Sequence, residues 1–150
     1  MKPLIVLITV FAISAWIITF ALGQNDASYS GRIAMSVMLL FTAMGHFRFQ
    51  KGMTLMIPPP IPFKKEVVIL TGLFEILAAA GLLIYSVSKL TGILLIIFFI
   101  AILPANIYAA MKKVDYEKAN YKGKGLSYLW FRIPLQILFI IWVYLSAINQ

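Results

Sequence analysis

Long apolar runs constrain this chain more than any other feature of its sequence. The first run, from Leu4 to Leu22, contains no charged residue. A helix rises about 1.5 Å per residue and needs about 20 mostly apolar residues to cross a bilayer core of about 30 Å. Similar runs recur along the chain, and 62% of the residues are hydrophobic while only 12% are charged. A soluble domain is only about half apolar and about a quarter charged, so the sequence indicates a polytopic membrane protein.

The apolar runs are longer than the roughly 9 to 11 residues of a transmembrane strand. We therefore predict an all-α transmembrane helix bundle in which residues 1–150 form a single domain. The expected helices cover about residues 4–22, 33–49, 67–85, 90–111 and 126–148, and the turn-prone segment "GQNDASYSG" separates the first two. The first run is alternatively a signal peptide, because Lys2 precedes it and "ALG" resembles a cleavage site. Its length favours a retained helix.

The positive charges predict the orientation of these helices. The formal net charge is +8, and cytoplasmic loops of membrane proteins are enriched in lysine and arginine. A cytoplasmic N-terminus places most of the cations on the cytoplasmic side, namely Lys2, Arg48, Lys51, Lys64, Lys65, Lys112, Lys113, Lys118, Lys122 and Lys124. Only Arg32 and Lys89 then lie near the other face. We expect a multi-pass protein of the cell (inner) membrane whose C-terminus, "SAINQ", is periplasmic or extracellular.

Several classes of site and partner are not expected. The chain has no cysteine, which excludes disulfides, thiolate metal sites and cysteine-ligated iron–sulfur clusters. His46 is the single histidine, so one chain cannot ligate a bis-histidine haem, and no paired metal-ligand motif is present. The lysines flank apolar spans as membrane topology requires, which argues against nucleic acid. The loop 112–124 also contains acidic residues, and its contact with anionic lipid headgroups is a secondary expectation.

A few polar residues lie within the apolar spans. An ionised side chain at the centre of a transmembrane helix costs about 2.5 to 3.5 kcal/mol on insertion scales, so such residues usually face the bundle interior and are functional candidates. Their positions place all of them in the cytoplasmic half of the membrane. We predict that they line one ligand-binding pocket: His46, Glu75, Asn106, Arg132 and Gln136.

Two prolines support a pocket at this level. Pro104 and Pro134 each remove a backbone donor beside the polar residues, a break that membrane helices tolerate near a cavity or a neighbouring group. The segment Pro58–Pro60 is expected to be extended, either capping the pocket or serving as a rigid connector. A purely structural alternative pairs Glu75 with Arg132 and uses the two amides as interhelical hydrogen bonds.

The order of several motifs resembles that of the DoxX-like membrane proteins. From residue 32 to residue 144 the chain contains "GHF", "MIPPPIPFKKEVVILTGLFEILAAAGLLI", "LPANIYAA" and "LWFRIPLQILFIIWVY". The resemblance implies a four-helix membrane core, with residues 4–22 as one extra N-terminal transmembrane helix. It also implies a membrane component of a redox or oxidative-stress system, since the family is associated with terminal quinol oxidase and thiosulfate:quinone oxidoreductase chemistry.

These observations lead to one main expectation and two alternatives. The main expectation is a protein that binds a small apolar or amphipathic ligand, with a quinone as the cofactor class, in the polar pocket. The alternatives are a structural or assembly subunit of a membrane complex, and a membrane isomerase or lipid-modifying enzyme that uses Glu75 as its acid or base. Membrane lipids, subunits of a membrane redox complex and further copies of the chain are the expected partners.

Overall fold

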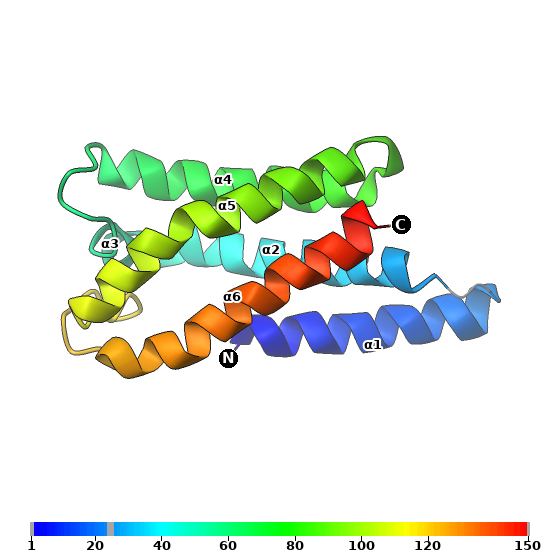
Figure 1. The fold of residues 1–150 in the computed structure, drawn as a ribbon, viewed down its shortest axis with the longest axis horizontal. Helices are drawn as coiled ribbons and strands as arrows, with labels where there is room; N and C mark the ends of the chain where they lie inside the picture. Colours follow the sequence, from blue (N-terminus) through cyan, green and yellow to red (C-terminus); the bar gives the residue numbers. More distant parts are fainter. Residues whose placement is uncertain (1, 24–25, 150) are drawn as a thin grey trace.

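The computed structural model describes residues 2–23 and 26–149, and its chain runs back and forth as an antiparallel bundle of long helices (Figure 1). Gln24 and Asn25 of the predicted turn, and Gln150 at the end of the predicted outer C-terminus, lie outside the described residues. The all-α fold is confirmed. Its elements are α1 (Lys2–Leu22), α2 (Ala27–Arg48), α3 (Gln50–Thr54), α4 (Lys64–Leu83), α5 (Tyr85–Met111), the 3₁₀ turn η1 (Gly125–Tyr128), α6 (Leu129–Val143) and the π-helical turn η2 (Tyr144–Ile148).

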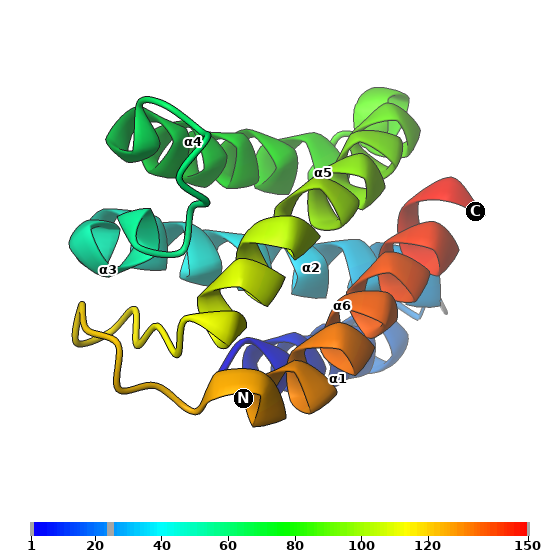
Figure 2. The same cartoon turned by 60° about the vertical axis from the view of Figure 1, so that its left-hand side comes forward.

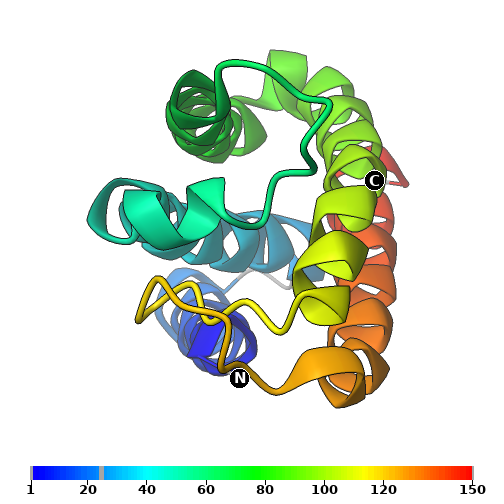
Figure 3. The same cartoon turned by 90° about the vertical axis from the view of Figure 1, so that its left-hand side faces the viewer.

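Four helices in the described part of the chain are long and apolar enough to cross a membrane, which indicates a membrane protein: α1, α4, α5 and the combined segment Gly125–Ile148. The remaining long helix, α2, has sufficient length but carries more polar residues. It lies between α1 and α4 and also contacts α6 and η2 (Figure 3). Because other helices cover α2 on several faces, its sequence need not be apolar all round.

The structure corrects several predicted helix boundaries. The second helix begins at Ala27 rather than near residue 33, because the Asp26 carboxylate accepts a hydrogen bond from the backbone N–H of Tyr29 (2.8 Å) and caps the helix. Much of the predicted turn segment is therefore helical. Ile84 alone joins α4 to α5, so α5 begins at Tyr85 instead of residue 90. The prolines at 104 and 134 lie inside continuous helices.

One end of the bundle gathers the lysine-rich segments, as Figures 1 and 2 show. Here α2 and α5 end, α4 and α6 begin, and the loop 112–124 folds back. The side chain of Asp115 organises this loop by accepting hydrogen bonds from the backbone N–H groups of Glu117 and Lys118, each 3.1 Å long. Lys2, at the start of α1, forms an exposed ion pair with Glu117 (3.1 Å).

The proline-rich connection at the same end is not fully extended. The backbone N–H of Ile61 donates to the carbonyl of Pro58 (3.2 Å), which makes a turn. Lys64 then folds back and donates to the carbonyl of Ile57 (2.9 Å). The expectation of an extended course over Pro58–Pro60 was therefore wrong, because the chain must reverse direction between α3 and α4.

Close packing of α2 against α4 depends on a glycine. A methyl group at Gly72 would lie 2.8 Å from Cβ of His46, closer than real contacts allow. Small residues of this kind let transmembrane helices approach each other closely. The same contact continues along the two helices through buried Met35, Leu39, Ala79 and Leu82. Gly72 thus fixes which residues of α4 face His46.

We predict that Gly72→Ala destabilises the bundle. Overpacking costs about 1 to 3 kcal/mol, and for a chain of this size each kcal/mol shifts the thermal midpoint by about 2 to 4 °C. Thermal unfolding in mild detergent measures this shift. Gly45→Ala is the matched control, because its new methyl would meet only the flexible end of Met53 at 3.5 Å. Equal midpoints for the two variants would contradict the close-packing account.

Candidate functional site

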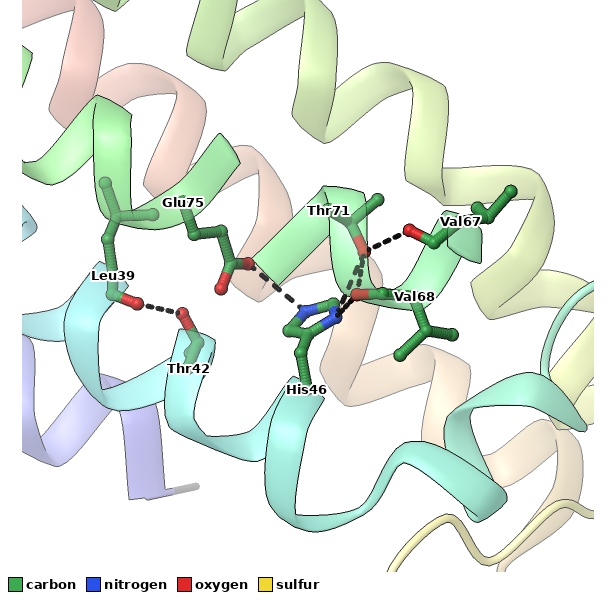
Figure 4. Close-up of polar contacts among 7 residues, drawn as sticks. All are labelled: Leu39, Thr42, His46, Val67, Val68, Thr71 and Glu75. Carbon is green, nitrogen blue, oxygen red and sulfur yellow. Dashed lines mark hydrogen bonds and ion pairs between the residues drawn. The ribbon is translucent and has the colours of Figure 1, made fainter. Parts of the chain in front are cut away.

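Glu75 and His46 face each other across the contact of α4 with α2 (Figure 4). Oε1 of Glu75 lies 3.6 Å from Nε2 of His46, and the two side chains are 7% and 18% exposed, respectively. This distance is longer than a hydrogen bond, but it suffices for an ion pair when the imidazole is protonated. The structure therefore gives the buried carboxylate of Glu75 a partner on the neighbouring helix.

The other ring nitrogen of His46 is fixed by backbone and hydroxyl groups of α4. Nδ1 lies 3.1 Å from the carbonyl oxygen of Val68 and 3.1 Å from Oγ1 of Thr71 (Figure 4). A carbonyl oxygen only accepts, so the hydrogen-bond network assigns the N–H to Nδ1. Nε2 of a neutral ring then presents its lone pair to Glu75. The two side chains can hold one proton between them, either as neutral imidazole with carboxylic acid or as imidazolium with carboxylate.

The second carboxylate oxygen of Glu75 has no hydrogen-bond partner, although it is buried. Buried polar atoms are nearly always hydrogen-bonded in proteins, and each exception calls for an explanation such as a catalytic role or an unseen bound group. Thr42, one turn before His46 on α2, does not serve this oxygen because its hydroxyl donates to the carbonyl of Leu39 (3.0 Å). Oε2 of Glu75 is therefore left without a donor from the described residues.

A second pair of polar side chains, Asn106 and Gln136, joins α5 to α6. The side-chain amide of Asn106 donates to Oε1 of Gln136 (3.4 Å). Gln136 in turn donates through Nε2 to the backbone carbonyl of Phe99. Both side chains are buried. Their amide groups are largely engaged with each other and with the α5 backbone, next to the stretch where Pro104 removes a backbone donor.

Arg132 lies near the start of α6, at the edge of a small cavity. The cavity has a volume of about 30 Å³ and is lined by Met56 from the proline-rich connection, Asn106, and residues of the lysine-rich loop and its flanks. This volume accommodates about one water molecule. The guanidinium lies over the ring of Tyr128 at 5.8 Å. Burial raises the pKa of the nearby Tyr116 phenol, and the charge of Arg132 opposes this shift.

The predicted site residues thus form two groups on different helix pairs. His46 and Glu75 meet between α2 and α4, while Asn106 contacts Gln136 and shares a cavity with Arg132. Among the described residues no ion pair links Glu75 to Arg132, and His46 is the ion-pairing partner of Glu75 instead. His46, Asn106 and Arg132 lie toward the lysine-rich ends of α2, α5 and α6. Glu75 and Gln136 lie near the middle of α4 and of the segment Gly125–Ile148. The location of all five in the cytoplasmic half stays a prediction.

A larger hollow lies elsewhere in the bundle. It has a volume of about 300 Å³ and is formed by Val10, Ile13, Ile17 and Ile18 of α1 with Ile33 of α2. Ser14 also borders it, but its hydroxyl hydrogen-bonds to the carbonyls of Phe11 and Ser30. None of the predicted site residues lines this hollow.

Sequence reasoning missed two polar features. The first is the support that Thr71 and the Val68 carbonyl give to His46. These residues lie four and seven positions before Glu75, so helical spacing places them on the face of Glu75. The second is the burial of Arg32, which was predicted near the membrane face opposite the lysine-rich segments and is only 5% exposed. Beginning the second helix at the Asp26 cap would have placed Arg32 inside it.

The chain belongs to the family described as a domain of unknown function, DUF8561, whose family model matches residues 35–147. The matched segment begins within α2 and continues to η2, so α1 precedes it. No curated protein and no solved structure matches the chain. The resemblance to the DoxX-like proteins stays a prediction.

We predict that Asn106 and Gln136 are energetically coupled. Gln136→Leu leaves the Asn106 amide and the Phe99 carbonyl without their partner, at a cost of about 0.6 to 2 kcal/mol, which is the range for hydrogen bonds between transmembrane helices. Combined with Asn106→Leu, it should cost less than the sum of the two single changes. Denaturant unfolding of the three variants in detergent measures the coupling, and strictly additive losses would contradict it.

Proposed function

We propose that this DUF8561 protein binds the polar head of a small apolar or amphipathic molecule, a quinone in class, at the pair His46 and Glu75. The observation that supports this proposal most strongly is the buried Glu75 carboxylate. One of its oxygens lies near His46, and the other has no partner among the described residues. A quinone carbonyl can accept a hydrogen bond from the carboxylic acid form of Glu75, and a quinol hydroxyl can donate a hydrogen bond to its unpaired oxygen Oε2. The resemblance to DoxX-like proteins supports this ligand class and a role in a redox or oxidative-stress system.

The bundle suggests how such a ligand is held. The cavity of about 30 Å³ beside Arg132 cannot enclose a quinone ring. The apolar body of the ligand would therefore remain in the surrounding lipid, with only its head between the helices. Because Asn106 and Gln136 are engaged with each other and Arg132 lies at the cavity beside Asn106, we assign head recognition to His46 and Glu75.

The charge distribution supports the proposed location. The lysine-rich loop 112–124 lies at the same end as the last residue of α2, the short helix α3 and the first residue of α4, which are or contain Arg48, Lys51 and Lys64, respectively. By the positive-inside rule this end faces the cytoplasm. The protein then lies in the inner membrane with its N-terminus cytoplasmic and its C-terminus outside, and the binding pair lies in the cytoplasmic half.

A structural function is the second candidate. It is favoured by the set formed by Asn106, Gln136 and the Phe99 carbonyl, which satisfies its own hydrogen bonds and leaves little room for a ligand. In this case the polar groups fix helix packing in a subunit of a membrane complex. Glu75→Gln and Arg132→Met would then lower thermal stability in detergent with no specific effect on ligand affinity.

Binding of decylubiquinone to the purified protein in mild detergent tests the main proposal. Decylbenzene, which has the same chain but no carbonyl, is the control compound. We expect decylubiquinone to raise the thermal midpoint of the protein, as any ligand of the native state does, and decylbenzene to leave it unchanged. Glu75→Leu should weaken quinone affinity about tenfold or more, since a hydrogen bond to a charged group contributes about 1.5 to 3 kcal/mol.

Glu66→Leu is the matched control variant, because Glu66 lies exposed in the first turn of the same helix. It should bind decylubiquinone as the unchanged protein does. Equal affinity of the Glu75→Leu and Glu66→Leu variants would refute the assignment. Glu75→Gln distinguishes the enzymatic alternative from simple binding. If Glu75 is the acid or base of an enzyme, this variant should lose turnover but still fold and bind its ligand.

A further inference from the structure

Arg32 lies at the opposite end of the bundle from the lysine-rich loop and takes no part in the proposed quinone site. It stands in the second turn of α2, about 8 Å along the helix axis from Ala27. Its side chain is nine-tenths buried, with a residue exposure of 5%. Its contacts come from the start of α5, at Tyr85 and Ser88, and from the first turn of its own helix, at Tyr29.

The guanidinium of Arg32 makes few polar contacts for a buried cation. Nη1 donates one hydrogen bond to the Ser88 hydroxyl (3.2 Å), whereas the buried Nε has no partner among the described residues. The rings of Tyr29 and Tyr85 lie 5.4 and 5.8 Å from the guanidinium carbon. These rings attract the charge through their π faces, but they cannot accept the N–H in the fork geometry that an oxyanion provides.

The described part of the chain supplies no carboxylate to this arginine. Only five acidic residues are present in the sequence. Glu66 lies in the first turn of α4, and Glu75 pairs with His46. Asp115 and Glu117 belong to the loop at the lysine-rich end. Asp26, the remaining one, caps α2 at the backbone of Tyr29. Arg32 thus carries its charge into the bundle without an anion from these residues.

A buried charge without a counter-ion is costly, so arginines inside membrane bundles normally pair with an anion or line a functional site. One turn deeper on the same face of α2, the hydroxyl of Ser36 is also buried without a hydrogen-bond partner. Two buried polar groups on one helix face thus lack partners among the described residues. They indicate a ligand that accepts hydrogen bonds and carries negative charge.

We propose that Arg32, with the rings of Tyr29 and Tyr85, forms a binding site for a phosphate group at this end of the bundle. Arginine is suited to phosphate because two of its N–H groups can bind two phosphate oxygens together. The level of the site matches lipid headgroups. Tyrosines concentrate at the membrane interface, and Tyr29 and Tyr85 are 39% and 79% exposed at the helix ends. The nearest abundant phosphate is that of a membrane lipid.

Native mass spectrometry of the full chain, released from mild detergent, tests this site. The probes are phosphatidylglycerol, diacylglycerol with the same acyl chains and inorganic phosphate. We expect the protein to retain phosphatidylglycerol about tenfold more strongly than diacylglycerol, from the strength of a charge-assisted hydrogen bond. If millimolar inorganic phosphate displaces phosphatidylglycerol, the result would also support a phosphate site. It would identify free phosphate, rather than a lipid headgroup, as the ligand.

Two variants locate the effect. Arg32→Gln should lose the preference for phosphatidylglycerol, whereas Lys89→Gln, which removes an exposed cation beside Ser88, should keep it. Tyr85→Leu changes only an exposed ring and should weaken the preference for phosphatidylglycerol. This variant therefore replaces Arg32→Gln in the test if Arg32→Gln does not fold. Equal retention of phosphatidylglycerol and diacylglycerol by the unchanged protein would overturn the proposal. Loss in Lys89→Gln equal to that in Arg32→Gln would overturn it as well.

Discussion

The buried carboxylate of Glu75 requires a partner inside the bundle, and the contact between α2 and α4 supplies it. Glu75 lies in an apolar helix, where an isolated charge is strongly disfavoured. Gly72 lets α4 approach α2 closely enough for His46 to reach Glu75, while Val68 and Thr71 orient the imidazole from the same helix. The contact of these two helices therefore combines close packing with the pair formed by Glu75 and His46.

The polar character of α2 follows from its central place. This helix carries buried Arg32 and Ser36 toward one end and His46 near the other, and each faces another helix rather than lipid. The four candidate membrane spans have only 17% to 33% of their most apolar windows buried in the bundle, and they are correspondingly apolar. The bundle thus places two unlike polar features at its two ends, a histidine and carboxylate pair on the lysine-rich side and a cation between tyrosine rings on the other.

The sequence predicted the long helices, because the length of the apolar runs determines them. It did not predict which helices are neighbours. Glu75 could reach either Arg132 or His46 at similar depth, and only the packing of α4 on α2 at Gly72 selects the histidine. The buried state of Arg32 was missed for a local reason, since a capping interaction at Asp26 extends α2 beyond its apolar run.

Infrared difference spectroscopy of the carboxyl group of Glu75 tests the central claim most directly. The spectrum of the purified protein is recorded before and after decylubiquinone is added, and the band of Glu75 is identified by its absence in Glu75→Gln. We predict that the quinone shifts this band, because its head forms a hydrogen bond with the pair that Glu75 shares with His46. An unchanged Glu75 band at saturating quinone would contradict this account.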